Sequence, residues 1–188
     1  MNSRSSDPSK LLLSRRGFLT GLASSAGLLA TSPVLAAVTP AVERTLSFYH
    51  THTGERAEVT YWADGNYLAE GLQKLNRLLR DHRSGEAAAM DQGLLDTLYA
   101  LNLSLCEPGE FEIISAYRSP KTNAMLAGKS GGVAKRSLHM QGKAIDIRVR
   151  GCNLKQLREK AVALKAGGVG YYPKSDFIHV DTGRVRYW

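Results

Sequence analysis

The chain has 188 residues, of which 43% are hydrophobic, and it carries a formal charge of +8 at pH 7. This length corresponds to one domain or slightly more. The charged share of 22% and the ordinary apolar content exclude a disordered polyelectrolyte. No long apolar run follows the N-terminal region, which excludes a polytopic membrane protein. The basic excess leaves nucleic-acid binding open until the positions of the charges are considered.

The N-terminal segment is typical of an export signal rather than of folded structure. The pair Arg15 and Arg16 precedes a charge-free stretch that ends in small residues. We expect residues 1–37 to be a Tat (twin-arginine) signal peptide, which the Tat translocase carries to the periplasm and which is cleaved near Ala36 or Ala37. The alternative is an uncleaved anchor, but Gly, Ser, Thr and Pro dilute the apolar stretch. We therefore expect no stable membrane anchor.

Removal of residues 1–37 lowers the net charge and weakens the case for nucleic-acid binding. This segment has four basic residues and one acidic residue, which leaves +5 of the +8 on residues 38–188. The remaining basic residues show no recognition motif and no interleaving with aromatic residues, so we expect no nucleic-acid partner. A mildly basic exported protein is equally suited to the anionic groups of a cell wall. We expect residues 38–188 to form a single domain.

Hydrophobic periodicity predicts a hairpin, two helices, two strands, a third helix and a second hairpin. Asp91 and Asn153 are suited to cap the second and third helices. This order, with helices first and a mostly antiparallel sheet afterwards, indicates the α+β class. The expected ranges are strands 46–51 and 57–62, helices 67–79 and 91–101, strands 111–115 and 143–149, helix 153–166, and strands 169–172 and 177–182.

Two cysteines, Cys106 and Cys152, lie far apart in the sequence. An oxidising compartment permits a disulfide between them, and two partly buried thiols are the alternative. Their wide spacing, with no neighbouring Cys or His pair, argues against a zinc knuckle.

Three candidate metal ligands lie in the second half of the chain: His139, Asp146 and His179. Two imidazoles and a carboxylate form a set that zinc uses when a fourth position stays open for water. Strand alternation places Asp146 opposite an apolar face and puts Asp181 on the same face as His179. Gly142 and the strand that follows argue against a helix at His139. We therefore expect a site built from strands. We expect none of His50, His52 and His82 to be a metal ligand.

The segment from residue 137 to 146 resembles the signature of the D-alanyl-D-alanine metallopeptidases, peptidase family M15, in the superfamily of lysostaphin, D-alanyl-D-alanine peptidases and hedgehog proteins. It reads Ser137-x-His139-x-x-Gly142-x-Ala144-x-Asp146. Other segments are similar to the murein endopeptidase K branch, and the likeness covers nearly all of residues 38–188. These segments are residues 115–120, 122–123, 167–173 and 177–183.

This resemblance implies a hedgehog/D-Ala-D-Ala-peptidase-like fold, with a central antiparallel sheet and helices packed on one side. It also implies a monomeric zinc peptidase that hydrolyses peptide cross-links of peptidoglycan through a metal-activated water. One Zn²⁺ per chain would be held by His139, Asp146 and His179. The implied activity is an endopeptidase. The alternatives are a D,D- or L,D-carboxypeptidase and a non-catalytic, metal-containing peptidoglycan-binding module.

The resemblance also suggests roles for further residues. Arg118 would stabilise the developing oxyanion or hold a substrate carboxylate, unless it forms only a surface salt bridge. Ser137 and Tyr117 would lie beside the ligands or the substrate. Relatives that cleave the D-Ala-D-Ala dipeptide carry a general-base Glu three residues before the last His ligand, where this chain has the shorter Asp176. We expect Asp176 to be the base and Asp181 to orient a ligand. The alternative is that Asp181 is the base and that Asp176 only forms the turn.

Overall fold

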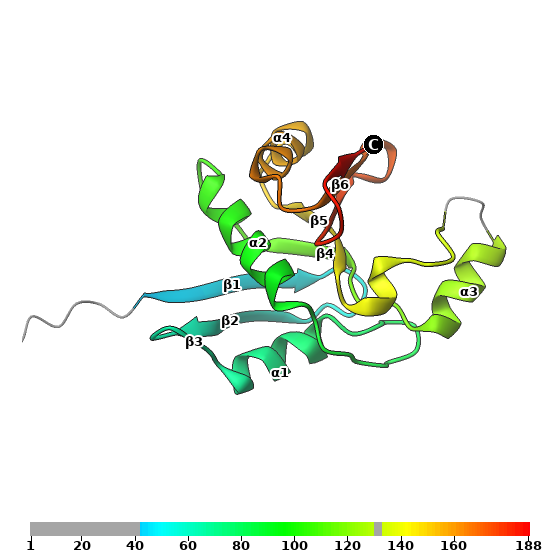
Figure 1. The fold of residues 1–188 in the computed structure, drawn as a ribbon, viewed down its shortest axis with the longest axis horizontal. Coiled ribbons are helices and arrows are strands. Elements are labelled where there is room, and N and C mark those ends of the chain that lie inside the picture. The colour runs from blue at the N-terminus through cyan, green and yellow to red at the C-terminus, as the bar shows by residue number, and fades with distance from the viewer. Residues whose placement is uncertain (1–41, 130–132) are drawn as a thin grey trace, which may run out of the picture. The chain divides into compact units, whose positions relative to one another are not determined.

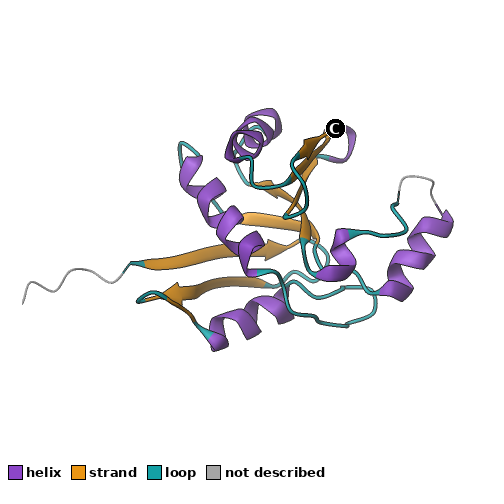
Figure 2. Cartoon of the chain, in the orientation of Figure 1, coloured by secondary structure: helices purple, strands orange, loops and turns teal. Residues whose placement is uncertain are grey.

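The computed structural model describes residues 42–129 and 133–188, which form an eight-stranded mixed sheet with four α-helices (Figures 1 and 2). The Tat signal predicted at residues 1–37 lies outside this range. Among the described helices, none is long and apolar enough to cross a membrane. The elements are β1 (Glu43–His50), β2 (Arg56–Ala63), β3 (Asn66–Tyr67), α1 (Ala69–Leu78), α2 (Gln92–Ser104), β4 (Phe111–Ser115), α3 (Pro120–Lys129), the 3₁₀ turn η1 (Leu138–Gln141), β5 (Ala144–Val149), α4 (Leu154–Leu164), β6 (Gly168–Tyr172), the 3₁₀ turn η2 (Pro173–Ser175), β7 (Phe177–Asp181) and β8 (Arg186–Tyr187).

The strands follow the order β3-β2-β1-β4-β5-β7-β6-β8 across the sheet. Both predicted hairpins are present, as the antiparallel pairs β1–β2 and β6–β7. The α+β class is confirmed. The sheet is mostly antiparallel, as expected, but it is mixed, because β1 pairs with β4 and β6 pairs with β8 in parallel. Strand pairing across such distances in the chain depends on tertiary packing, which periodicity within one strand does not report.

The sheet has one apolar and one polar face. Register places apolar residues opposite one another from strand to strand, as in the pairs Phe48↔Phe111 and Ile147↔Ile178. These side chains form one buried core with apolar residues of α1, α2 and α4, such as Leu98 of α2. The alternate positions carry polar side chains and face away from that core. The three helices therefore cover one face, and the other face is free to carry a site.

Helices α2 and α4 begin directly after the predicted capping residues. The Asp91 carboxylate accepts a hydrogen bond from the Leu94 amide at 3.0 Å and begins α2. The Asn153 side chain accepts from the Lys155 amide at 3.0 Å and begins α4. The helix ends at Leu164, two residues before the predicted end, because Lys165 takes the left-handed conformation with φ 52°.

Helix α3 was not predicted from the sequence. It begins at Pro120 after Ser119, whose hydroxyl accepts a hydrogen bond from the Thr122 amide at 3.3 Å. Pro in the first turn after a capping Ser is a normal helix start. The buried residues of α3 are the polar Thr122 and Asn123. Without an apolar face, the helix produces no hydrophobic period that sequence inspection could detect.

The two cysteines are free thiols in the structure. Cys106 is exposed and Cys152 is partly buried, and both line one surface cavity. Of the two alternatives weighed from the sequence, the structure has the pair of thiols.

Candidate metal centre

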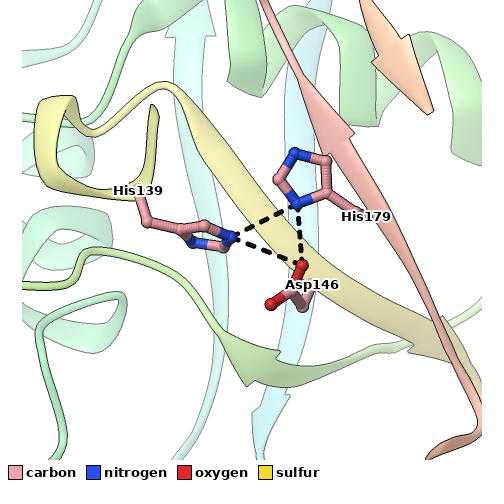
Figure 3. A group of neighbouring side chains, drawn as sticks. All are labelled: His139, Asp146 and His179. Atoms are coloured by element: carbon pink, nitrogen blue, oxygen red, sulfur yellow. Dashed lines mark hydrogen bonds and ion pairs between the residues drawn. The ribbon is translucent and has the colours of Figure 1, made fainter. Parts of the chain in front are cut away.

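The polar face of the sheet brings His139, Asp146 and His179 together (Figure 3). His139 Nε2 lies 3.3 Å from His179 Nδ1 and 3.4 Å from Asp146 Oδ1, and the latter two atoms are 2.9 Å apart. Asp146 and His179 are directly opposite each other on β5 and β7. All three residues are buried or nearly so. Three donor atoms thus converge from segments that are up to 40 residues apart.

His139 reaches the cluster from η1, so the expectation that every ligand lies on a strand is wrong for this residue. The Ser137 hydroxyl caps the turn by accepting from the His139 amide at 3.4 Å. Gly142 ends the turn with φ 66°, and a side chain there would collide with the backbone of Ala89. The spacing Ser-x-His-x-x-Gly therefore encodes one capped turn of helix, and a turn this short fits before β5.

The hydrogen-bond partners of the two imidazoles set which nitrogen carries the proton. His139 Nδ1 donates to the carbonyl of Ala116 at 2.7 Å, and His179 Nε2 donates to Asp181 Oδ2 at 2.8 Å. In the neutral rings, His139 Nε2 and His179 Nδ1 therefore present lone pairs to each other and to the Asp146 carboxylate. Three lone-pair donors in contact require a cation between them, and a proton or a metal ion meets that need.

The spacing of these atoms fits a tetrahedral metal ion. Ligands at about 2.0–2.1 Å from Zn²⁺ lie about 3.3 Å from one another in tetrahedral coordination. The three separations in the cluster, 2.9, 3.3 and 3.4 Å, are close to that value. Two His and one Asp, with a pocket on the open side, match zinc sites that keep one position free. The residues present therefore fit a zinc ion.

The electrostatics of the cluster favour positive charge. Burial alone would raise the pKa of the Asp146 carboxyl, but the charge of the facing His139 and the hydrogen bonds that protonated imidazoles donate hold that pKa well below its usual range. Burial alone would lower the pKa of His179, but its hydrogen bonds to Asp146 and Asp181 raise the pKa above its ordinary value. The same field that holds a proton on an imidazole also attracts a divalent cation.

Arg118 lies at the edge of this cluster. Its guanidinium Nη2 is 3.9 Å from Asp146 Oδ2, and its side chain is only 12% exposed. Two further contacts are long, at 3.3 Å to Asn123 Oδ1 and 3.4 Å to Ser115 Oγ, and its buried Nε has no hydrogen-bond partner among the described residues. The Arg118 amide donates to the His139 carbonyl at 3.1 Å. The structure therefore fixes Arg118 beside the ligands with donor capacity to spare.

A buried carboxylate supports the loop that carries Arg118. Asp81 is 1% exposed, and it accepts hydrogen bonds from the amides of Ser119 and Arg83, both at 2.9 Å. Burial alone would raise its pKa. Hydrogen bonds from the Thr122 side chain and from these amides outweigh burial and hold the pKa well below its usual range. Asp81 thus stabilises the fold in its ionised form.

Replacing Asp81 with Asn is expected to lower the free energy of unfolding at pH 7 by about 2 kcal/mol, because charge-assisted hydrogen bonds in a buried site are lost. The folded pKa lies below the unfolded value of about 3.9, so the contribution is complete above that pH and is lost as the pH falls through the folded pKa. Urea denaturation at pH 7 and pH 3 should show the difference between the two proteins shrink. Asp64→Asn, in an exposed turn, is the control. An Asp81 variant as stable as this control would contradict the prediction.

The remaining predicted site residues are placed as follows. Asp181 is completely buried behind His179, in the place predicted for a residue that orients a ligand. Ser137 caps η1 and lines the pocket beside the cluster. Tyr117 was expected beside the ligands or the substrate, but its side chain packs against the hydrophobic core and does not line the pocket. Its neighbour Arg118 takes the pocket side of the loop.

Asp176 does not join the cluster in this structure. It ends η2 in the left-handed conformation with φ 53°, its side chain is 63% exposed, and Oδ2 accepts from Arg148 Nη1 at 3.0 Å. Arg148 in turn binds Glu112 at 2.6 Å. Phe177, the next residue, does line the pocket. The position predicted for the general base thus lies at the rim of the site, with its carboxylate paired outward.

The open side of the cluster is a pocket of about 260 Å³. Its lining includes an aromatic wall formed by Tyr172, Phe177 and Trp188, in which the first two rings stack at 4.7 Å. From the sequence, Tyr172 and Trp188 are expected to pack on the sheet, with a place in the substrate groove as the alternative for one of them. Arg186, which lines the pocket too, is expected from the sequence to be a solvated basic residue, with attraction of an anionic peptide as the alternative if it lies near the site. Only the pairing of β6 with β7 and β8, which is set by tertiary structure, brings them to the site.

Comparisons with known proteins show the family of the chain. The sequence profile of a peptidase family described as "Peptidoglycan L,D-endopeptidase MepK" matches residues 38–188. The peptidoglycan L,D-endopeptidase MepK of Escherichia coli (strain K12) is 41% identical over 170 residues, which cover 90% of this chain and 93% of that protein. The probable peptidoglycan L,D-endopeptidase MepK of Haemophilus influenzae is 43% identical over 171 residues, which cover 90% and 91%.

The search of solved structures found no significant match. The family profile nevertheless spans the whole region that carries the sheet and the cluster, and both relatives are well above 30% identity over nine tenths of the chain. The chain therefore belongs to the MepK family of M15 peptidases, as its resemblance to the murein endopeptidase K branch predicted.

Proposed function

We propose that this chain is a zinc-dependent endopeptidase that hydrolyses L,D peptide bonds in peptidoglycan cross-links. The observation that carries the proposal is the convergence of His139 Nε2, Asp146 Oδ1 and His179 Nδ1 at tetrahedral spacing. The family membership and the printed activity of both relatives support the substrate and the bond. The face opposite the helices carries the site, which supports a hedgehog/D-Ala-D-Ala-peptidase-like fold.

Each residue of the site has a distinct task in this proposal. His139, Asp146 and His179 would hold the zinc ion, and Asp181 fixes the ring of His179. A zinc ion there would polarise the scissile carbonyl and make hydroxide available near neutral pH. Arg118 donates to the oxygen on which negative charge develops, and its planar fork can hold that oxygen while Nη2 stays near Asp146. The aromatic wall lines one side of this pocket.

We retain Asp176 as the proposed general base. Among the described residues that line the pocket, Asp146 is the only carboxylate, and it belongs to the cluster. Asp176 adjoins the pocket through Phe177, and an exposed ion pair such as its contact with Arg148 contributes at most about 1 kcal/mol. Substrate binding can therefore release the carboxylate toward the pocket. Asp181 is unsuited to this role because its oxygens are occupied by other donors.

Replacing Asp176 with Asn is expected to lower kcat by about 10²–10⁴-fold while the zinc content stays unchanged, because proton transfer is lost and the ligands are untouched. Steady-state kinetics on a purified cross-linked muropeptide and metal analysis of the same sample measure both quantities. Asp64→Asn serves as the control for the loss of one exposed carboxylate in a turn. Retention of kcat within about threefold of the control would remove Asp176 from the mechanism.

Bond specificity is tested with two muropeptide dimers, one joined through an L,D bond and one joined through a D,D bond. Incubation of each with the zinc-loaded protein, followed by mass spectrometry, should yield monomers from the L,D dimer alone, with summed masses equal to the dimer plus one water. Release of a terminal residue without separation of the dimer would instead identify a carboxypeptidase. Binding of the dimers with no new products would identify a binding module.

We also propose that the protein works in the periplasm. The twin-arginine pattern at Arg15 and Arg16 supports export by the Tat translocase, with residues 1–37 as a cleaved signal and residues 38–188 as a single zinc-peptidase domain. The Tat route carries folded proteins, which suits a domain that acquires a metal ion before export. The peptidoglycan activity of the relatives supports the same compartment.

A further inference from the structure

Behind the cluster, five hydrogen-bond donors surround the carboxylate of Asp181. Oδ2 accepts from His179 Nε2 at 2.8 Å and from Arg186 Nη2 at 2.7 Å. Oδ1 accepts from Arg186 Nη1 at 2.9 Å and from the amides of Gly168 at 3.1 Å and Gly183 at 2.8 Å. The Asp181 side chain is 0% exposed. A carboxylate with all its lone pairs occupied cannot rotate without breaking several of these bonds.

Arg186 is the cation that balances this buried carboxylate. Its guanidinium binds both oxygens in a fork, which fixes orientation as well as charge. The backbone leaves space for the pair: a Cβ on Gly168 would lie 2.6 Å from Asp181 Oδ2 and 2.7 Å from Arg186 Cζ, and a Cβ on Gly183 would lie 3.0 Å from Asp181 Oδ1. Glycine at these two positions therefore allows Arg186 and Asp181 to meet.

The other side of Arg186 contacts the aromatic wall of the pocket. Its guanidinium carbon lies 4.9 Å from the centre of the Trp188 ring, at cation–π distance. The Trp188 ring is 5.4 Å from the His179 ring, and its Nε1 donates to Tyr172 Oη at 2.8 Å. The Arg186 side chain is only 30% exposed. The guanidinium is thus held between a buried carboxylate and an indole that itself packs beside the ligand His179.

We propose that Arg186 is a positioning residue of the metal centre. By fixing Asp181, it fixes the His179 ring with Nε2–H directed at Asp181 and Nδ1 directed at His139 and Asp146. Without the guanidinium, Asp181 is a buried charge with unoccupied acceptor positions, and the His179 ring loses its rigid support. The inference rests on the metal-dependent function proposed above and adds a residue whose task is to keep a ligand aligned.

The test measures metal binding and requires no turnover. Metal-free protein competes with a chromophoric chelator for Zn²⁺, and affinities are compared for the wild type, Arg186→Ala, Arg186→Lys and the matched control Arg184→Ala. Arg184 is exposed in the same segment. Loss of an outer partner of a metal ligand typically costs 10–100-fold in affinity, which we expect for Arg186→Ala. The Zn²⁺ affinity of Arg186→Lys should lie between those of Arg186→Ala and the control, because Lys keeps the positive charge but lacks the planar fork of the guanidinium. Arg184→Ala should bind as tightly as the wild type.

A spectroscopic measurement separates positioning from general destabilisation. With Co²⁺ in place of Zn²⁺, the visible absorption bands of Arg186→Ala should shift or broaden, because the alignment of His179 changes, whereas those of Arg184→Ala should match the wild type. Zn²⁺ affinity and Co²⁺ bands that match the control would overturn the proposal. If Arg186→Ala does not fold, the same two measurements are made on Arg186→Lys. A Zn²⁺ affinity and Co²⁺ absorption bands equal to those of the control would then overturn the proposal. A wild type that binds zinc but cleaves nothing would refute the proposed function and leave this inference standing.

Discussion

Replacing His139 with Ala is expected to remove both the bound zinc and the hydrolysis of cross-linked muropeptides. Three protein ligands share the binding energy of the site, and complete zinc sites are worth about 10–16 kcal/mol. Loss of one ligand should therefore weaken zinc binding by at least about 10²–10³-fold. His139 is also the ligand with the most constrained setting, since its Nδ1 donates to Ala116 O at 2.7 Å and its turn is capped at both ends.

The matched control is His52→Ala, a histidine that is exposed and stacks on His82 at 4.0 Å, away from the cluster. It should keep one zinc per chain and wild-type kinetics. Zinc content by elemental analysis and product formation by mass spectrometry measure the two effects on the same preparations. A His139→Ala protein that still binds one zinc and cleaves the substrate would show that the cluster is not the metal centre.

Replacing Arg118 with Ala is expected to lower kcat by about 10²–10³-fold while the zinc content stays at the wild-type level. This is the usual cost of removing one donor that stabilises a developing oxyanion. Arg118 contacts Asp146 only at 3.9 Å, so the metal ligands keep their own hydrogen bonds when it is lost. Arg118→Lys should recover only part of the rate, because an ammonium group cannot bind an oxygen as a planar fork does.

Arg77→Ala, in an exposed position on α1, is the control for the loss of one positive charge. Steady-state kinetics separate two possible tasks of Arg118. A fall in kcat at constant KM indicates stabilisation of the transition state, and a rise in KM alone indicates binding of a substrate carboxylate. Kinetic constants equal to those of the Arg77 variant would exclude Arg118 from the reaction.

Local signals in the sequence account for much of the fold. The hairpins follow from alternating apolar residues, and the starts of α2 and α4 follow from Asp91 and Asn153, because these patterns act within a few residues. The parallel pairing of β1 with β4 and the polar helix α3 depend on contacts made across the chain. No local period encodes such contacts, so sequence inspection does not detect them.

The candidate site also contains residues that the local sequence predicts and residues that it does not. The spacing of His139 and Asp146 is local, because one capped turn and one strand separate them, and both could be named from the motif. Arg186 could not be identified in this way, because an Arg five residues after Asp181 resembles any surface charge until β8 pairs with β6. The orientation of Asp176 was also beyond prediction, since its ion pair with Arg148 of β5 depends on the tertiary packing of the η2 turn.

Removal and restoration of the metal ion decide whether cleavage depends on the cluster of His139, Asp146 and His179. The purified protein is stripped of metal with a chelator, assayed on a muropeptide dimer joined through an L,D bond, and assayed again after addition of one equivalent of Zn²⁺. We expect no cleavage after stripping and recovery of the wild-type rate with zinc, because the proposed reaction requires a metal-activated water. Undiminished cleavage by the stripped protein, with its zinc content shown to be negligible, would contradict it.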